Sequence, residues 1–293
     1  MKSPSLHSIR EILEKMGFSS DKDTLSAVAF TSEEDGAPYA VWRIDTAERT
    51  YVLKQAKGDE PWIYSTYLDI ESPSVPRLYA VAHHEEHDYL LTEFVSGKSL
   101  LALDKANLPQ VLDALIDLQR KYWGTEAPSK KLSDTYARRI ARGRHLNDAT
   151  LEAAYEGYLQ QFQSLPRTLC HDDLLPFNVI FSEERAVLID WEAAGILSYP
   201  TSLARLLAHG ENSSDAFFRL TDEDRIFAID YYYETMIRGK GISYEEYRRA
   251  LDFCFFYEYC EWVMLGNKYG DTDTERFKRY FALAKDLAEK LIQ

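Results

Sequence analysis

Residues 168–192 read TLCHDDLLPFNVIFSEERAVLIDWE, and this stretch decides how the rest of the chain is interpreted. Two apolar, β-branched runs, NVIF and AVLID, stand on either side of the four polar residues SEER. Such a pattern predicts a β-hairpin with a four-residue turn. In that hairpin Asn178 opens one strand and Asp190 closes the other, so both lie at the same end. We expect Asp173, in the loop just before Asn178, to lie close to them.

Three oxygen-bearing side chains that converge in this way suit the transfer of a phosphoryl group. Mg²⁺ prefers carboxylate, amide and phosphate oxygens and is usually held by one or two protein carboxylates together with a nucleotide. Asp190 and Asn178 fit the role of metal ligands, which leaves Asp173 to orient a substrate hydroxyl and accept its proton. The alternative is that these residues only cap backbone groups of a hairpin. For His171 we expect a structural role, hydrogen-bonding to the backbone of the loop, and not metal ligation.

The run HDDLLPFN followed by IDWE resembles the signature of the aminoglycoside phosphotransferase and choline kinase-like family, a relative of the protein kinases. The resemblance implies an α+β, two-lobed protein kinase-like fold. A small β-rich N-lobe is expected over residues 1–95 and a larger helical C-lobe over residues 96–293. It also implies ATP or GTP and Mg²⁺ as cofactors, and the hydroxyl of a small molecule as the acceptor of the γ-phosphoryl group.

Segments upstream follow the order that this resemblance requires. The apolar run VLK ends at Lys54, where the family has its phosphate-binding lysine, and Glu60 opens the next helical segment, where the ion-pair partner of that lysine is expected. The run LLTEFVSG resembles the hinge between the lobes. The resemblance therefore implies that Glu93, Phe94 and Val95 offer backbone groups to the nucleotide base.

Two features depart from the family pattern. Asp172 occupies a position that is usually glycine, so it competes with Asp173 for the role of the base. The turn expected to cover the phosphates, residues 30–38, has one glycine and three adjacent carboxylates, which would repel a triphosphate unless they point away. These departures motivate an alternative, a nucleotide-binding pseudokinase or regulatory protein without turnover. A protein kinase is a further alternative, disfavoured because no recognisable activation loop follows Asp190.

Composition excludes several other classes. The chain has 293 residues, of which 45% are hydrophobic, and this is ordinary for a folded protein of two domains. Its formal charge of −14 argues against a nucleic-acid partner and against a membrane surface. Neither a signal-peptide pattern nor a membrane-spanning apolar run is evident, so we expect a cytoplasmic protein. The three cysteines lack metal-like spacing and are expected to be reduced and mostly buried.

Periodicity gives a coarse secondary structure. Apolar residues at helical spacing from Leu6 to Leu13, followed by Gly17, predict an N-terminal helix. Short β-rich segments predict a five-stranded antiparallel sheet, with one helix near 61–69. The five segments are 25–32, 38–45, 50–56, 77–82 and 88–95. Helices are expected to dominate from Ser96 onward, and they include helices from about 107, 221 and 244 and a last one over 273–292.

The helix expected over 244–266 carries a hypothesis about the acceptor. Glu258 and Glu261 lie one turn apart among aromatic residues and away from the polar stripe of this helix. With Tyr257 and Trp262 they would bind a cationic acceptor, resembling an aminoglycoside or choline, through ion pairs and cation–π contacts. The alternatives are that the helix has two exposed faces, or that the glutamates pair with arginines of a neighbouring helix.

Overall fold

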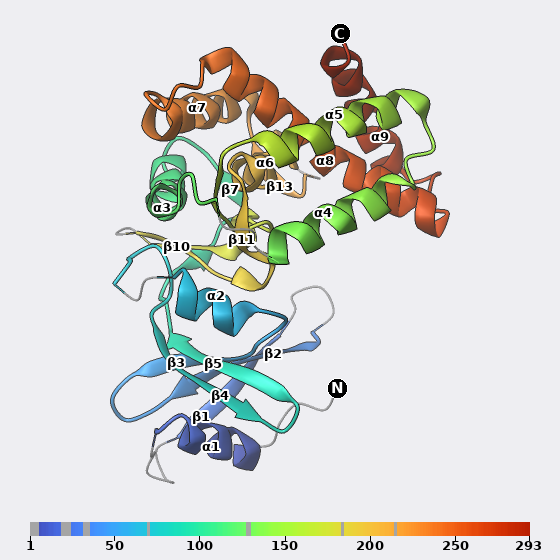
Figure 1. Cartoon of the computed structure of the whole chain (residues 1–293). Coiled ribbons are helices and arrows are strands. Elements are labelled where there is room, and N and C mark those ends of the chain that lie inside the picture. Colours follow the sequence, from blue (N-terminus) through green and yellow to red (C-terminus); the bar gives the residue numbers. More distant parts are fainter. Residues whose placement is uncertain are drawn as a thin grey trace. The chain divides into compact units, whose positions relative to one another are not determined.

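The computed structural model forms two compact units, which are described separately (Figure 1). One unit comprises residues 1–98 and 180–192, and the other comprises 99–179 and 193–293. The residues described are 6–18, 25–31, 36–68, 71–126, 130–182, 185–213 and 216–293. Residues 32–35 of the acidic turn lie outside this set. Within the described ranges, none of the helices has the length and apolar character needed to cross a membrane.

The first unit is built on a five-stranded sheet, as the alternating sequence pattern predicted. Neighbouring strands are antiparallel, and their order is β1-β2-β3-β5-β4. The strands are β1 (Ser26–Thr31), β2 (Pro38–Asp45), β3 (Thr50–Gln55), β4 (Leu78–His84) and β5 (His87–Glu93). The predicted sheet is therefore confirmed, with small differences in where individual strands begin and end.

The N-terminal helix α1 (Leu6–Lys15) supplies the core on one face of this sheet. Ile9, Ile12 and Leu13 recur at intervals of three or four residues, so they share one side of the helix. All three are buried against the sheet residues Trp42, Ile44, Tyr51, Leu53, Tyr89 and Leu91. The chain leaves the helix at Gly17 with a φ of +80°, a conformation that favours glycine.

The opposite face of the sheet carries Lys54. Leu53 belongs to the core beneath α1, and side chains alternate along a strand, so its neighbour Lys54 points to the other face. Helix α2 (Glu60–Thr66) covers that face and has Pro61 in its first turn, which favours the start of a helix. The alternation of side chains along β3 therefore places Lys54 on the face of the sheet that α2 covers.

A β-hairpin from later in the chain joins the first unit. Its strands are β9 (Val179–Phe181) and β10 (Ala186–Leu188), and Ser182 N donates to Arg185 O at 3.0 Å between them. Leu188 N donates to Ser74 O at 2.8 Å, and Arg185 forms an ion pair with Glu93 at 2.5 Å. These contacts group residues 180–192 with the sheet. The expected boundary at residue 95 would place residues 180–192 in the helical part. Contacts between residues so far apart in the chain cannot be deduced from the order of the segments.

Helices form most of the second unit. They are α3 (Leu108–Lys121), α4 (Lys130–Gly143), α5 (Ala149–Ser164), α6 (Thr201–Leu207), α7 (Asp222–Tyr232), α8 (Tyr244–Tyr269) and α9 (Glu275–Leu291). A π-helical turn, Tyr233–Ile237, follows α7. The capping box at Ser243 and Glu246 is present at the start of α8, as predicted. Helix α8 is largely buried and packs against α5, α6 and α9 (Figure 1).

Short strands complete the second unit. They are β7 (Ala102–Leu103), β8 (Arg167–Cys170), β11 (Gly195–Ser198), β12 (Gly210–Glu211) and β13 (Phe218–Leu220), while β6 (Lys98–Ser99) lies at the boundary of the units. Strands β8 and β11 pair in antiparallel fashion. The loop that follows β8 holds the motif HDDLLPFN, so this pair fixes where the loop begins.

Candidate functional site

In the first unit, Lys54 is the centre of a charged cluster. Its ammonium group lies 2.8 Å from Oε1 of Glu60 and contacts Oδ1 of Asp190. The Glu60 side chain is 1% exposed, and the Lys54 side chain is 17% exposed. The ion pair predicted between Lys54 and the first residue of α2 is therefore present, and Asp190 joins it from the end of the hairpin.

Burial and charge act in opposite directions on these groups. Burial disfavours the charged form of Lys54, but Glu60 and Asp190 outweigh that effect and raise the pKa of the lysine. The pKa of Glu60 is raised because it is buried, although Lys54 opposes the shift. Lys54 therefore stays protonated at neutral pH and is able to bind phosphate oxygens.

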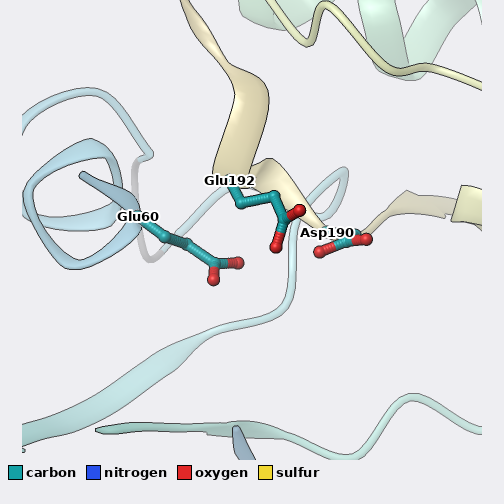
Figure 2. A group of neighbouring side chains, drawn as sticks. All are labelled: Glu60, Asp190 and Glu192. Atoms are coloured by element: carbon teal, nitrogen blue, oxygen red, sulfur yellow. The ribbon is translucent and has the colours of Figure 1, made fainter. Parts of the chain in front are cut away.

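Glu192 adds a third carboxylate to this cluster. Oxygen atoms of Glu60, Asp190 and Glu192 lie within 4.8 Å of one another, and Figure 2 shows the three carboxylate groups turned toward one another. Glu60 Oε2 is buried without a hydrogen-bond partner. Hard oxygen donors and an unsatisfied carboxylate oxygen fit a Mg²⁺ ion, although the Lys54 ammonium supplies the positive charge in this structure. Glu192 belongs to the IDWE run, but the sequence alone did not indicate a role for it.

The backbone at Asp190 is set by its neighbours. Asp190 has a φ of +65°, an uncommon conformation for a residue other than glycine. The next residue, Trp191, is 1% exposed, and its Nε1 donates to Leu188 O at 2.8 Å. Anchoring of this indole holds the chain in a tight bend and directs the Asp190 carboxylate to Lys54.

In the second unit, the loop after β8 begins with a buried histidine. His171 is 0% exposed, and its backbone nitrogen donates to Ser202 Oγ at 2.9 Å. Ser202 lies on α6, so this bond ties the loop to that helix. Burial of the side chain fits a structural role for His171, while the hydrogen bond expected from it to the backbone of the loop stays a prediction.

The two aspartates that follow differ in their surroundings. Asp172 has a φ of +58°, which explains why glycine suits this position, and its side chain is only 8% exposed. Its carboxylate lies 2.7 Å from Arg139 and 3.5 Å from Arg138. The Asp173 side chain is 40% exposed and lines a cavity of about 670 Å³. Asp172 is therefore nearly buried, whereas Asp173 is accessible to solvent.

Arg205 on α6 holds the Asp173 carboxylate. Its Nε and Nη2 donate to Asp173 Oδ1 at 3.1 and 2.8 Å, and its Nη1 donates to Glu258 Oε2 at 2.8 Å. Glu261 lies 3.6 Å from the same Nη1. These carboxylates raise the pKa of Arg205 far above its ordinary value despite burial. Sequence reasoning missed Arg205, since an arginine in an apolar helix after the IDWE motif carries no local signal of this role.

Glu258 is the most buried of the carboxylates around Arg205. Its side chain is 4% exposed and also lies 3.2 Å from His209 Nε2, while His209 Nδ1 is 2.9 Å from the Tyr280 hydroxyl. Burial alone would raise the pKa of Glu258, but Arg205 and His209 lower it well below its ordinary value. The pKa of Glu261 is raised by burial and by the neighbouring charge of Glu258.

Asn178 closes the loop in a short 3₁₀ helix, Pro176–Asn178. Its Nδ2 donates to the backbone oxygen of Asp173 at 2.9 Å, which leaves the amide oxygen as the atom suited to a metal. Asp173 and Asn178 belong to one compact unit and Asp190 to the other. The convergence of all three side chains therefore stays a prediction.

The expected hinge is partly engaged in other contacts. Glu93 N donates to Arg77 O at 2.8 Å, and the Glu93 carboxylate pairs with Arg185, so this residue does not offer its amide group. The guanidinium of Arg43 lies over the ring of Phe94, with Cζ 5.0 Å from the ring centroid. Val95 is buried. The expectation that backbone groups of Glu93, Phe94 and Val95 contact the nucleotide base stays a prediction.

The proposed cation site on α8 requires a correction. Glu258 and Glu261 line the cavity beside Asp173, but arginines already pair with both: Arg205 with Glu258 and Arg142 of α4 with Glu261. The alternative, that the glutamates pair with arginines of neighbouring helices, is therefore what the structure contains. A cationic ligand would have to displace these guanidinium groups.

The two aromatic residues of that hypothesis differ: Tyr257 lines the cavity and is also packed against other rings, whereas Trp262 serves packing. Tyr257 stacks on Tyr158 with centroids 4.9 Å apart, and the guanidinium of Arg139 lies 4.3 Å from its ring centroid. Trp262 stacks on Tyr280 with centroids 5.6 Å apart and does not line the cavity. Helical geometry placed both rings near the glutamates, but which face is buried depends on neighbouring helices.

Comparison with known proteins agrees with this architecture. A family model described as "Phosphotransferase enzyme family" matches residues 33–231. An aminoglycoside phosphotransferase of Alicyclobacillus acidocaldarius aligns at 14% identity over 100% of this chain and 96% of its own, with a TM-score of 0.62. A choline kinase of Cryptosporidium parvum aligns at 12% identity over 98% and 96%, with a TM-score of 0.59.

An ethanolamine kinase of Plasmodium vivax aligns at 11% identity over 97% of this chain and 87% of its own, with a TM-score of 0.60. Identities this low establish a shared fold and do not transfer a substrate. No curated protein sequence matches the chain. The predicted kinase-like fold is confirmed by these similarities together with the sheet and helices described above.

Proposed function

Because the chain belongs to the phosphotransferase enzyme family, we propose that it transfers the γ-phosphoryl group of ATP or GTP, with Mg²⁺, to a hydroxyl of a small molecule. The observation that carries the proposal is the position of Asp173. Its carboxylate lines a cavity of about 670 Å³ and is fixed there by Arg205. A cavity of this size suits a small-molecule ligand.

Asp173 acts as the residue that orients the acceptor hydroxyl and takes its proton. The acceptor oxygen forms a bond to the γ-phosphorus while the bond from that phosphorus to the bridging oxygen breaks, which releases the nucleoside diphosphate. Asp172 is less suited to this step, because its side chain is 8% exposed, whereas that of Asp173 is 40% exposed. The exposure of Asp173 supports its assignment as the base.

Lys54 binds nucleotide phosphates, and Glu60 positions it. The 2.8 Å ion pair between them and the burial of Glu60 support these roles, since a buried partner limits the motion of the lysine. Asn178 and Asp190 would hold Mg²⁺, and Glu192, whose carboxylate lies near that of Asp190, would be a further ligand. The metal, when bound, neutralises charge on the phosphate oxygens.

The short connection after Asp190 disfavours a protein kinase. Between Asp190 and the start of β11 at Gly195 the chain forms only a 3₁₀ turn, Trp191–Ala193. A segment of this length leaves no room for an activation loop that binds a polypeptide. A small acceptor in the cavity beside Asp173 fits the geometry better.

Calorimetry and a transfer assay together test the proposal. We expect Mg²⁺-dependent binding of ATP or GTP, and a phosphorylated small molecule when acceptors of several chemical classes are supplied. Nucleotide binding without any phosphorylated product would favour the pseudokinase alternative. Label that reached polypeptide substrates and no small molecule would favour a protein kinase.

A further inference from the structure

The cavity beside Asp173 presents its charges unevenly. Three of its carboxylates are largely buried: the side chains of Glu258, Asp172 and Glu261 are 4%, 8% and 20% exposed. Two of its cations are open to solvent, since Arg138 and Arg142 are 48% and 46% exposed. The exposed charged groups of the lining therefore include these two guanidinium groups and the carboxylate of Asp173, which is 40% exposed.

Each buried carboxylate already has an arginine partner, although Glu258 shares Arg205 with Asp173. Arg205 binds Glu258 at 2.8 Å, and Arg139 binds Asp172 at 2.7 Å. Arg142 contacts Glu261 only through Nη1, and Arg138 contacts Asp172 only through Nη2. Among the residues that the structure describes, the remaining nitrogen atoms of Arg138 and Arg142 make no hydrogen bond. Both guanidinium groups therefore have donors left for a ligand.

The C-terminal end of α8 adds a third cation and an apolar surface. Lys268 lines the cavity and is exposed. Leu265 and Tyr269 also line the cavity, and they are 45% and 65% exposed. These two residues lie one turn apart from each other on the same side of the helix. The mouth of the cavity thus combines cations with apolar side chains. This arrangement contrasts with the formal charge of −14 of the whole chain.

We propose that the acceptor is an anionic hydroxy compound whose carboxylate or phosphate group is bound by Arg138, Arg142 and Lys268. This inference rests on the proposed function, because it assigns the substrate of the same site. Guanidinium groups present planar arrays of donors that match carboxylate and phosphate oxygens. The apolar part of the acceptor contacts Leu265 and Tyr269, and its hydroxyl reaches Asp173.

The test uses two sets of compounds, each with one carbon skeleton, whose members are neutral, cationic or anionic. One set is glucose, glucosamine, glucuronate and glucose 6-phosphate; the other is glycerol, 2-aminopropane-1,3-diol, glycerate and glycerol 3-phosphate. Binding is measured by calorimetry without nucleotide. We expect the anionic members of at least one set to bind about tenfold more tightly than the neutral and amine members. The carboxylate and phosphate arms distinguish the two sources of negative charge.

Variants then assign the preference to the cavity. Arg138→Gln combined with Arg142→Gln should remove the preference for anions, whereas Arg144→Gln, an equal charge change just after α4 and outside the cavity lining, should leave it intact. Melting temperatures identify any variant that is misfolded, and Lys268→Gln provides a second measurement in that case. A smaller loss of anion affinity is expected for that variant.

Three results would overturn the inference: tighter binding of amine or neutral members, an anion preference that survives in the double variant, or no binding of any anionic member. Because these measurements need no turnover, they are independent of the proposed phosphoryl transfer. Conversely, efficient phosphorylation of glucosamine or of the amino diol would support the transfer reaction and contradict the anionic acceptor. The two failures are therefore distinguishable.

Discussion

Arg205 binds Asp173 through two nitrogen atoms, Nε at 3.1 Å and Nη2 at 2.8 Å, and both donate to the same carboxylate oxygen, Oδ1. The third nitrogen of the guanidinium binds Glu258, which is buried. The orientation of Asp173 is therefore set by a charged network inside the helical unit. Oδ2 of Asp173 is the oxygen to which an acceptor hydroxyl can donate.

Replacement of Arg205 by lysine tests this arrangement. An ammonium group is a single point charge and cannot hold Asp173 and Glu258 at once as the planar guanidinium does. We expect Arg205→Lys to lower kcat by about 10- to 100-fold, because loss of orientation at the reacting group is costly, with little change in nucleotide affinity. Arg144→Lys is the matched control. A kcat equal to that of the wild type would show that Arg205 does not position Asp173.

Asp172→Gly separates the two neighbouring aspartates. Removal of Asp172 leaves the buried Arg139 without its carboxylate partner, while glycine relieves the positive φ. The net effect should be a loss of about 3 kcal/mol in the free energy of unfolding, with a mild effect on turnover. Urea unfolding and steady-state kinetics measure both quantities. A collapse of turnover in a stable variant would make Asp172 the base.

Asp190→Ala should act through the metal. We expect weaker nucleotide binding in the presence of Mg²⁺ and a smaller effect in its absence, because the carboxylate is a hard oxygen ligand. Asn178→Ala should show the same pattern in milder form. Calorimetry of ATP with and without Mg²⁺ provides the measurement. Unchanged Mg²⁺ dependence in the Asp190 variant would remove that residue from the metal site.

Glu258 makes stability depend on pH. Its pKa in the folded protein is lowered from the ordinary value of 4.5, so the charged carboxylate stabilises the fold fully above that value and loses its effect as pH falls through the lowered pKa. Glu258→Gln should therefore cost roughly 2–3 kcal/mol at pH 7 and progressively less below about pH 4.5. Because the charge of Glu258 contributes to the raised pKa of Glu261, the comparison is also made in a Glu261→Gln background, where that second titration is absent. Urea unfolding across pH 3–7 tests this, and a difference that did not change with pH would contradict it.

Much of the fold could be predicted from local patterns. Short β-rich segments predicted the five-stranded sheet, and the order of the segments gave Glu60 as the partner of Lys54. The capping box at Ser243 marked the start of α8 correctly. These features depend on residues close together in sequence, where spacing and propensity carry the information.

The electrostatics of the site could not be predicted in the same way. Arg205 and Asp173 are 32 residues apart, and Arg142 and Glu261 are 119 residues apart. Only packing of α4, α6 and α8 brings such pairs together. Without those partners, Glu258 and Glu261 resembled a site for a cation. In the structure each is neutralised by an arginine.

Transfer of labelled γ-phosphate from ATP in the presence of Mg²⁺, compared between the wild type and Asp173→Asn, tests the central claim most directly. The substitution keeps size and hydrogen bonding but removes a proton acceptor, so we expect turnover to fall by about three orders of magnitude or more with little loss of nucleotide affinity. The wild type should release a labelled small molecule. Equal turnover by Asp173→Asn, or nucleotide binding by the wild type with no labelled small molecule from any class of acceptor, would contradict the account.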